Sequence, residues 1–239
     1  MPVNTDTVAR QQQRVLLEDF TGQRCVNCPR GTEIIEQLTQ QLTDSVLIAV
    51  SIHGGPLAFA GNARVMGLKT AVGDEYYNYW QLEYQPVGLV NRHGAVNYTD
   101  WTASVAEALG QLSSVNMWAE ASLTAEGIQI SVKAEAPETA VSGRLQVWLL
   151  EDGITAMQMM PDGSTSADYV HNHVLRTPVN GIWGEEMTLG EGETKTFSLT
   201  QPLDEAWNPE QLSIVAFVCN DRGVLQVVKT KVKYYYKNN

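Results

Sequence analysis

The chain has 239 residues, of which 44% are hydrophobic, enough for buried cores in one large or two small domains. Its 16 Lys and Arg residues against 27 Asp and Glu residues give a formal net charge of −11. Because nucleic acids and anionic membranes attract clustered positive charge, this balance argues against both as partners.

The N-terminal stretch offers no targeting element. PVNTDTVARQQQ, which follows Met1, lacks the apolar core of a secretory signal. The longest apolar run, SVLIAVSI (45–52), is far shorter than the ~20 residues of a membrane-spanning helix. The protein is therefore expected either to be cytosolic or to begin after a removed signal, and three cysteines alone do not decide between these compartments.

Residues 14–113 alternate strand-like and helix-like patterns. RVLLEDF (14–20) and SVLIAVSI (45–52) predict two buried parallel strands, and apolar residues at helical spacing between them predict a helix. VGLVN (87–91) predicts a third strand, followed by a turn and a short fourth strand. Apolar residues at helical spacing in 101–112 predict a closing helix.

From Val115 onward the pattern changes to period two. About six or seven short alternating segments follow, with turns predicted at EG (126–127) and DRG (221–223). This pattern is typical of an antiparallel β-sandwich.

The change of pattern predicts two domains. The first is an α/β domain at 14–113 with a long insertion at about 53–85, and the second is an all-β antiparallel sandwich domain at 114–239. The boundary is expected near 112–116.

Cys25 and Cys28 stand three positions apart between an apolar run and a helical pattern. A structural zinc site needs four ligands, and only Cys219 remains, inside a distant strand pattern, so we expect no metal. A structural disulfide between them closes a very small loop, which constrains the unfolded chain little. A redox role fits this setting better than either alternative.

The surroundings of the pair favour a reactive thiolate. Cys25 is expected at the start of a helix, where unpaired N–H groups and the helix dipole favour negative charge, and Arg24 and Arg30 flank the pair. Pro29 is tolerated in a first helical turn. Cys25 is therefore predicted to be the exposed nucleophile, and Cys28 to resolve the mixed disulfide.

Two segments resemble the thioredoxin superfamily. LLEDFTGQRCVNC resembles its active-site segment, in which Asp-Phe, four residues and Cys-x-x-Cys follow one another, and Asp19, Cys25 and Cys28 keep that register. QPVGLVNRHG resembles its cis-proline strand, which turns at a glycine eight positions on, and Pro86 and Gly94 keep that spacing. The resemblance implies a thioredoxin-like α/β fold for the first domain.

The chain departs from that family at three places. Arg24 precedes the pair where thioredoxins carry Trp, Val26 and Asn27 stand between the cysteines, and the insertion before Pro86 is longer. These differences bear on the substrate and the redox poise rather than on the fold.

The resemblance assigns roles to three further positions. Asp19 would be a partly buried carboxylate with a raised pKa that accepts the proton of Cys28, or else an ordinary polar residue at a strand end. Pro86 would be cis, and the backbone of Gln85 would bind an incoming peptide as an added strand. The simpler interpretation of Pro86 is a loop proline that starts an edge strand.

The aromatic segment YYNYWQLEY (76–84) precedes this proline. Trp80 and Tyr84 would form a wall of a peptide-binding site, or the segment packs the insertion onto the sheet. The expected partners are thus protein or peptide thiols and disulfides, with no cofactor.

Three histidines and one cysteine are further candidates. His53 follows a buried strand that ends on the rim of Cys25, where it either tunes the thiolate or lies on the loop surface. His171 and His173 would share a face of a strand, but no third ligand is evident, so a structural or interdomain role is favoured over metal binding. Cys219 is expected to be a small buried hydrophobe.

The two halves together with YVHNHVLR (169–176) are similar to the Omp-type outer-membrane lipoprotein family of Bacteroidetes. The resemblance implies a cell-envelope protein held at the outer membrane by a lipid, whose signal and lipid-bearing cysteine are absent from this chain. It also implies an adhesin or receptor role. Two hypotheses follow: an envelope thiol–disulfide oxidoreductase, and a surface binding protein that uses the fold as a scaffold.

Overall fold

The computed structural model describes residues 9–43 and 45–234. The first half of this region is mixed. Its helices and strands are β1 (Val15–Thr21), α1 (Cys28–Leu42), β2 (Leu47–His53), α2 (Ala71–Tyr79), β3 (Val87–Val90), β4 (Ala95–Asn97) and α3 (Trp101–Ala108).

The second half is built from strands alone, apart from one short 3-10 turn. They are β5 (Asn116–Thr124), β6 (Gly127–Glu135), β7 (Val141–Glu151), β8 (Ile154–Met159), β9 (Thr165–His171), β10 (Val174–Pro178), β11 (Glu185–Leu189), β12 (Thr194–Gln201), β13 (Leu212–Asn220) and β14 (Gly223–Lys233).

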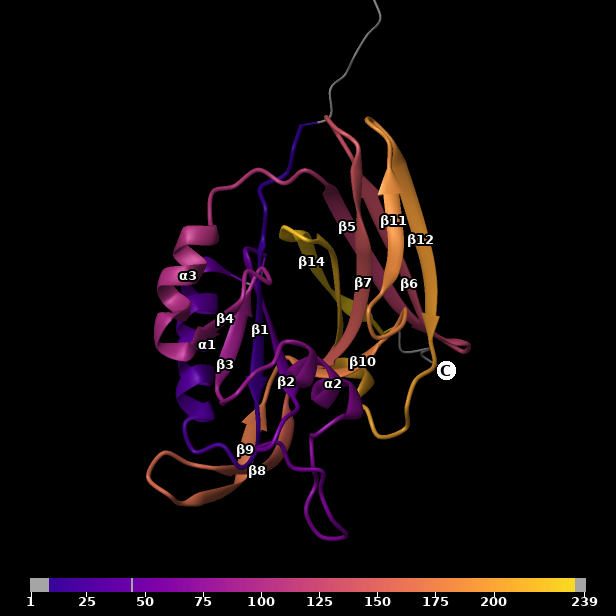
Figure 1. Ribbon diagram of the computed structural model, residues 1–239. Helices are drawn as coiled ribbons and strands as arrows, with labels where there is room; N and C mark the ends of the chain where they lie inside the picture. Colours follow the sequence, from indigo (N-terminus) through magenta and orange to yellow (C-terminus); the bar gives the residue numbers. More distant parts are fainter. Residues whose placement is uncertain (1–8, 44, 235–239) are drawn as a thin grey trace, which may run out of the picture.

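The strands β1 and β2 lie side by side and parallel, as their apolar runs predicted, with Val15 opposite Leu47 and Thr21 opposite His53. β3 pairs with β1 in the antiparallel sense, and β4 pairs with β3. Every residue of β1 is buried. The reason is that α1 and α3 cover one face of this part of the sheet (Figure 1), and buried residues of the second half pack against the other.

The helix α1 packs through the apolar positions that predicted it. Ile35 and Leu38 contact a cluster that includes Leu17 of β1 and Trp101 of α3. Pro29 occupies the first turn, where its missing N–H group costs no hydrogen bond.

The predicted turns of the second half are present. β5 and β6 form a hairpin in which Thr124 lies opposite Gly127. β13 and β14 form another, in which Asn220 lies opposite Gly223. Both hairpins belong to the larger sheet.

The predicted fold class, a thioredoxin-like domain followed by a separate β-sandwich, is wrong. Within the described residues, twelve strands form one mixed sheet in the order β12-β6-β5-β14-β13-β7-β10-β2-β1-β3-β4, with β11 on β7. The junction is β10, which pairs with β7 on one side and with β2 on the other. The strands β8 and β9 form a separate two-stranded sheet.

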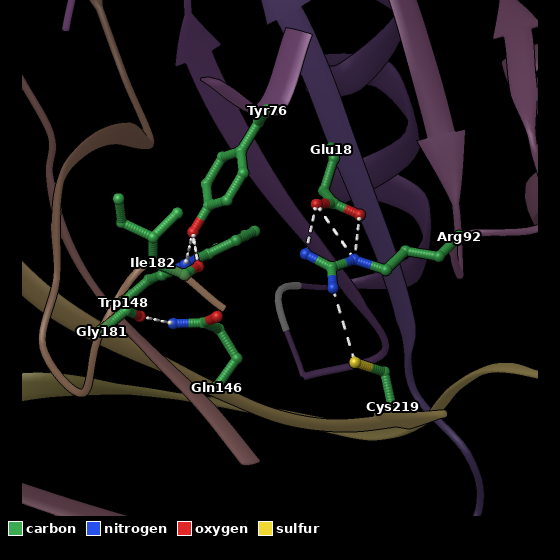
Figure 2. A network of polar contacts seen from close by, with 8 residues as sticks. All are labelled: Glu18, Tyr76, Arg92, Gln146, Trp148, Gly181, Ile182 and Cys219. Atoms are coloured by element: carbon green, nitrogen blue, oxygen red, sulfur yellow. Dashed lines mark hydrogen bonds and ion pairs between the residues drawn. The ribbon is translucent and has the colours of Figure 1, made fainter. Parts of the chain in front are cut away.

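One hydrophobic core also spans the two halves. Leu16 and Phe20 of β1 belong to the same buried cluster as Trp148 of β7 and Phe217 of β13. Tyr76 of α2 joins them, because Trp148 donates a hydrogen bond of 3.1 Å to its hydroxyl, which in turn donates to the carbonyl of Ile182 (Figure 2). The error has a physical reason: hydrophobic periodicity reports the type of an element but not which strand edge will pair with which.

A buried ion pair adds a polar link across this core. The guanidinium of Arg92, just after β3, binds both carboxylate oxygens of Glu18 at 2.9–3.3 Å (Figure 2). Its Nη1 donates to the sulfur of Cys219 on β13 at 3.5 Å. Burial lowers the pKa of Arg92, but the charge and hydrogen bonds of Glu18, with smaller contributions from Cys219 and Tyr76, together outweigh burial and leave that pKa raised.

No helix among the described residues is long and apolar enough to cross a membrane. The stretch after Met1, for which no secretory signal was expected, lies largely outside the described residues. The domain boundary near 112–116 stays a prediction.

Candidate redox site

Cys25 and Cys28 are joined by a disulfide, with their Cα atoms 5.3 Å apart. The N–H of Cys25 donates to the carbonyl of Gly22 at 3.0 Å, and the N–H of Cys28 donates to that of Cys25 at 3.3 Å. The chain therefore makes tight turns from the end of β1 into α1. Cys28 is the first helical residue, so Cys25 lies in the turn before the helix rather than at its start.

Both cysteines are only 2% exposed, so the prediction that Cys25 is an exposed nucleophile is wrong for the disulfide form. The loop at 54–70 covers one side. Its Leu57 accepts a hydrogen bond from the N–H of Arg24 at 3.0 Å. A Cβ atom on Gly22 would lie 2.4 Å from the backbone of Leu57, so only glycine permits this close approach.

The β8–β9 hairpin (residues 154–171) covers the other side. The amide of Gln158 donates to the carbonyl oxygens of Cys25 at 2.9 Å and Gly22 at 3.3 Å. The amide of Gln23 donates to the carbonyl of Met157 at 3.1 Å. Gln158 is a site residue that the sequence reasoning missed, because nothing in the sequence pattern links it to the cysteines.

Asp19 lies on the face of β1 that α1 covers, because side chains alternate along a strand and Leu17 points to the same face. It is 1% exposed, and its Oδ1 has no hydrogen-bond partner among the described residues. Burial raises the pKa of Asp19 to about 8. Its neighbour on β2 is Ser51, and two residues further along Thr21 lies opposite His53.

Two buried histidines, His53 on β2 and His171 on β9, lie side by side. The rings of His53 and His171 are 5.4 Å apart and nearly perpendicular. Burial lowers the pKa of His53 to about 3 and that of His171 to about 4. A small cavity of about 30 Å³ is lined by both rings together with Cys28, Thr21 and Ser51.

The bond between Gln85 and Pro86 is cis, as predicted. The side chain of Gln85 is buried and ties three segments together. Its amide donates to the carbonyl oxygens of Thr21 at 2.7 Å and Gly54 at 2.9 Å, and its Oε1 accepts from the N–H of Leu57 at 3.1 Å. Tyr84, next to it, is 44% exposed.

The structure does not bring Trp80 to the disulfide. It lines a separate cleft of about 890 Å³, together with Tyr79, Trp183, Arg92 and Cys219. Cys219 is 9% exposed, as expected for a small buried hydrophobe, and burial raises its pKa.

The prediction that His171 and His173 share a strand face is wrong. β9 ends at His171, and His173 adopts a left-handed backbone conformation with φ 58°. His173 pairs with Asp152 at 3.0 Å. Across residues 9–43 and 45–234, no group of three or more His, Cys, Asp or Glu side chains is placed to hold a metal ion.

Two solved structures have a similar fold over nearly the whole chain. HBP35 of Porphyromonas gingivalis has a TM-score of 0.73 at 12% identity, over 95% of this chain and 78% of that chain. A protein of Agrobacterium tumefaciens has a TM-score of 0.59 at 15% identity, over 95% of this chain and 100% of that chain. At such low identity the likeness shows the fold alone.

A third solved structure matches about half of the chain: a domain of the outer membrane lipoprotein Omp28 from Porphyromonas gingivalis is 31% identical over 51% of this chain and 90% of that domain, with a TM-score of 0.36. No curated protein sequence matches the chain. The family model of outer membrane protein Omp28 matches residues 73–235, well over half of the chain. The chain therefore belongs to the Omp28 family, and the predicted outer-membrane location is confirmed.

Proposed function

We propose that the chain is a thiol–disulfide exchange protein of the cell envelope, with Cys25 as the attacking and Cys28 as the resolving sulfur. The observation that carries this proposal is the buried carboxyl of Asp19 on the face of β1 that is covered by α1, the helix that begins at Cys28. Its pKa of about 8 is close to the ~8.5 of an ordinary thiol, so a proton passes between the two groups at little cost. A purely structural disulfide exchanges no proton and does not require such a group.

The exchange proceeds in two balanced steps. The thiolate of Cys25 attacks a client disulfide, forming a mixed disulfide and releasing one client sulfur as thiolate. The thiol of Cys28 gives its proton to the carboxylate of Asp19, and the resulting thiolate attacks the sulfur of Cys25. The second client thiolate leaves, and the Cys25–Cys28 disulfide forms. In the opposite direction the carboxyl of Asp19 protonates the departing sulfur of Cys28.

The proposed clients are protein or peptide thiols and disulfides. The resemblance of the Asp19–Cys25–Cys28 register and of the Pro86 strand to the thioredoxin superfamily supports this class of client. Tyr84 is an exposed aromatic side chain beside Gln85, where an extended peptide would lie against the strand that Pro86 opens. The buried state of the disulfide implies that the covering loop or hairpin moves when a client binds.

The reduction potential of the Cys25–Cys28 couple tests this proposal. The protein is equilibrated in glutathione buffers of graded ratio, quenched with acid, and the reduced fraction is measured by mass after alkylation. A midpoint in the range of known oxidoreductases, roughly −120 to −270 mV, is expected. A potential below about −300 mV, typical of structural disulfides, would contradict the proposal.

A second candidate function is ligand binding, as in an adhesin or receptor. The observation in its favour is the 890 Å³ cleft, whose walls carry Tyr79, Trp80 and Trp183 away from the disulfide. Such aromatic walls are common in binding sites. If binding is the sole function, partner capture from envelope extracts will fall in Trp80→Ala and Trp183→Ala but stay unchanged in Cys25→Ser.

A further inference from the structure

Asp19 alone does not carry the proton of Cys28 from the disulfide site to solvent. Cys25, Cys28 and Asp19 are 2%, 2% and 1% exposed, so a proton taken from Cys28 has no direct contact with water. Repeated exchange requires that proton to reach solvent, because Asp19 otherwise stays loaded after one turnover. A polar path from the cysteine to the surface is therefore needed.

The cavity beneath Cys28 has the composition of such a path. Its volume of about 30 Å³ accommodates one water molecule. Both ring nitrogens of His53 and the Nε2 of His171 are buried and have no hydrogen-bond partner among the described residues. Buried polar atoms in folded proteins are nearly always hydrogen-bonded to protein or to ordered water, so three unpaired atoms around one cavity point to a bound water.

The cavity also extends to the surface. Its lining includes the exposed Glu36 of α1 and the half-buried Asn172 and His173 that follow β9. The titratable side chains that line the cavity with the two rings are Glu36 from α1, Tyr169 from β9 and His173 after β9. The charge of Arg176 on β10 also acts on His53, and that of Asp19 on β1 acts on Tyr169.

We propose that this cavity holds a water molecule bound by His53 and His171, and that the two imidazoles relay the proton of Cys28 between the buried thiol and solvent. The inference rests on the proposed exchange function. Both rings are neutral at pH 7, because their pKa values lie near 3 and 4. A neutral imidazole has one N–H donor and one acceptor nitrogen, so it accepts a proton on one side and releases one on the other without retaining charge.

The two sulfurs can be observed separately with an aromatic disulfide as oxidant. All proteins carry Cys219→Ser, so only the pair reacts. The thiolate of reduced Cys25 attacks the reagent and releases one aryl thiolate in a step that depends on reagent concentration. Cys28 then loses its proton, attacks Cys25 and releases the second aryl thiolate in a step that does not. Stopped-flow absorbance resolves the two phases.

The variants His53→Gln and His171→Gln are compared with His93→Gln, a control in an exposed turn outside the site. Loss of either relay ring is expected to slow the second phase at least about tenfold and to flatten its pH profile. The first phase should stay within about twofold, and the control should leave both phases unchanged. Equal slowing of both phases, or an unchanged second phase, would overturn the relay.

A measurement on the protein without histidine substitutions covers the case in which a variant does not fold. A relay moves more than one proton in the same step. A plot of the second-phase rate against the deuterium fraction of the solvent should therefore bow below the straight line that joins its two end points. A straight line would overturn the relay. Release of fewer than two aryl thiolates would instead contradict the exchange function itself, which separates the two failures.

Discussion

The side-chain amide of Gln158 on β8 donates a hydrogen bond of 2.9 Å to the backbone carbonyl oxygen of Cys25. The two residues are 133 positions apart, and Gln158 is 2% exposed. Through this contact the β8–β9 hairpin of the second half holds the disulfide turn of the first half closed. Access to the disulfide therefore depends on how readily the hairpin opens.

Replacing Gln158 by Ala should speed the reduction of the disulfide. The change removes the hydrogen bonds to Cys25 and Gly22, each worth roughly 1 kcal/mol, so opening should become about five- to thirtyfold more frequent. The rate is measured with a small thiol reductant, followed by alkylation and mass analysis. Gln40→Ala, at an exposed position of α1, is the matched control and should react like the wild type. Equal rates in all three proteins would show that the hairpin does not control access.

Replacing Asp19 by Asn should stabilise the protein at alkaline pH. The folded pKa of Asp19, about 8, lies above the unfolded value of 3.8, so its contribution to stability is fully present below pH 3.8 and is lost as pH rises to about 8. Asn does not titrate. Since one pKa unit is worth about 1.4 kcal/mol, the interval sets an upper bound of roughly 6 kcal/mol.

Urea unfolding at pH 4 to 9 measures this effect. The unfolding free energy of Asp19→Asn should approach that of the wild type near pH 4 and exceed it increasingly up to about pH 8, then by a constant amount. A difference independent of pH would show that Asp19 does not titrate in this range.

Acid should destabilise the protein through His53. Its folded pKa of about 3 lies below the usual 6.5, so between these pH values the unfolded chain binds a proton at His53 and the folded protein does not. Stability is therefore lost as pH falls from about 6.5 towards 3, and His53→Gln should lose less over this window. Thermal melts across that range test this, with the exposed His93→Gln as the control that keeps the wild-type acid sensitivity. Parallel curves for the two variants would contradict the assignment.

The Glu18–Arg92 pair should matter far more than a surface pair. Glu18→Gln leaves the buried charge of Arg92 uncompensated, which should cost about 3–5 kcal/mol of unfolding free energy. Glu186→Gln breaks a pair whose side chains are 44% and 89% exposed, so it should cost less than about 1 kcal/mol of unfolding free energy.

Urea unfolding of the wild-type protein should show one transition by both circular dichroism and tryptophan fluorescence, because the halves share a core. Two separated transitions would contradict the shared core.

The elements of the first half were predictable because each carries its own pattern. β1 and β2 are apolar runs, and α1 shows helical spacing at Ile35 and Leu38. The single sheet was not predictable, because it depends on the five-residue strand β10 pairing with β2 at one position, Val174 opposite Ser51. The hydrophobic periodicity of a strand does not show which other strand will pair with its edge.

The site residues that lie in local sequence motifs were likewise predictable, and those brought in by tertiary contacts were not. Asp19, Cys25 and Cys28 lie within one local register, and the cis bond before Pro86 followed from a second local motif. Gln158 and His171 reach the disulfide only through the β8–β9 hairpin, which is far along the chain and docks by tertiary contacts. Sequence reasoning placed His53 on the rim but could not reveal its buried partner.

The most direct test of the exchange function is to trap mixed disulfides in cells that carry cysteine variants. Cells with Cys28→Ser or Cys25→Ser are quenched with acid, and envelope fractions are compared on non-reducing gels. Cys28→Ser should accumulate high-mass adducts that disappear on reduction, because Cys25 attacks but no resolving sulfur releases the client. Cys25→Ser should show none, because the attacking sulfur is gone. Identical lanes without adducts in either variant would contradict the exchange function and leave only the family and the fold.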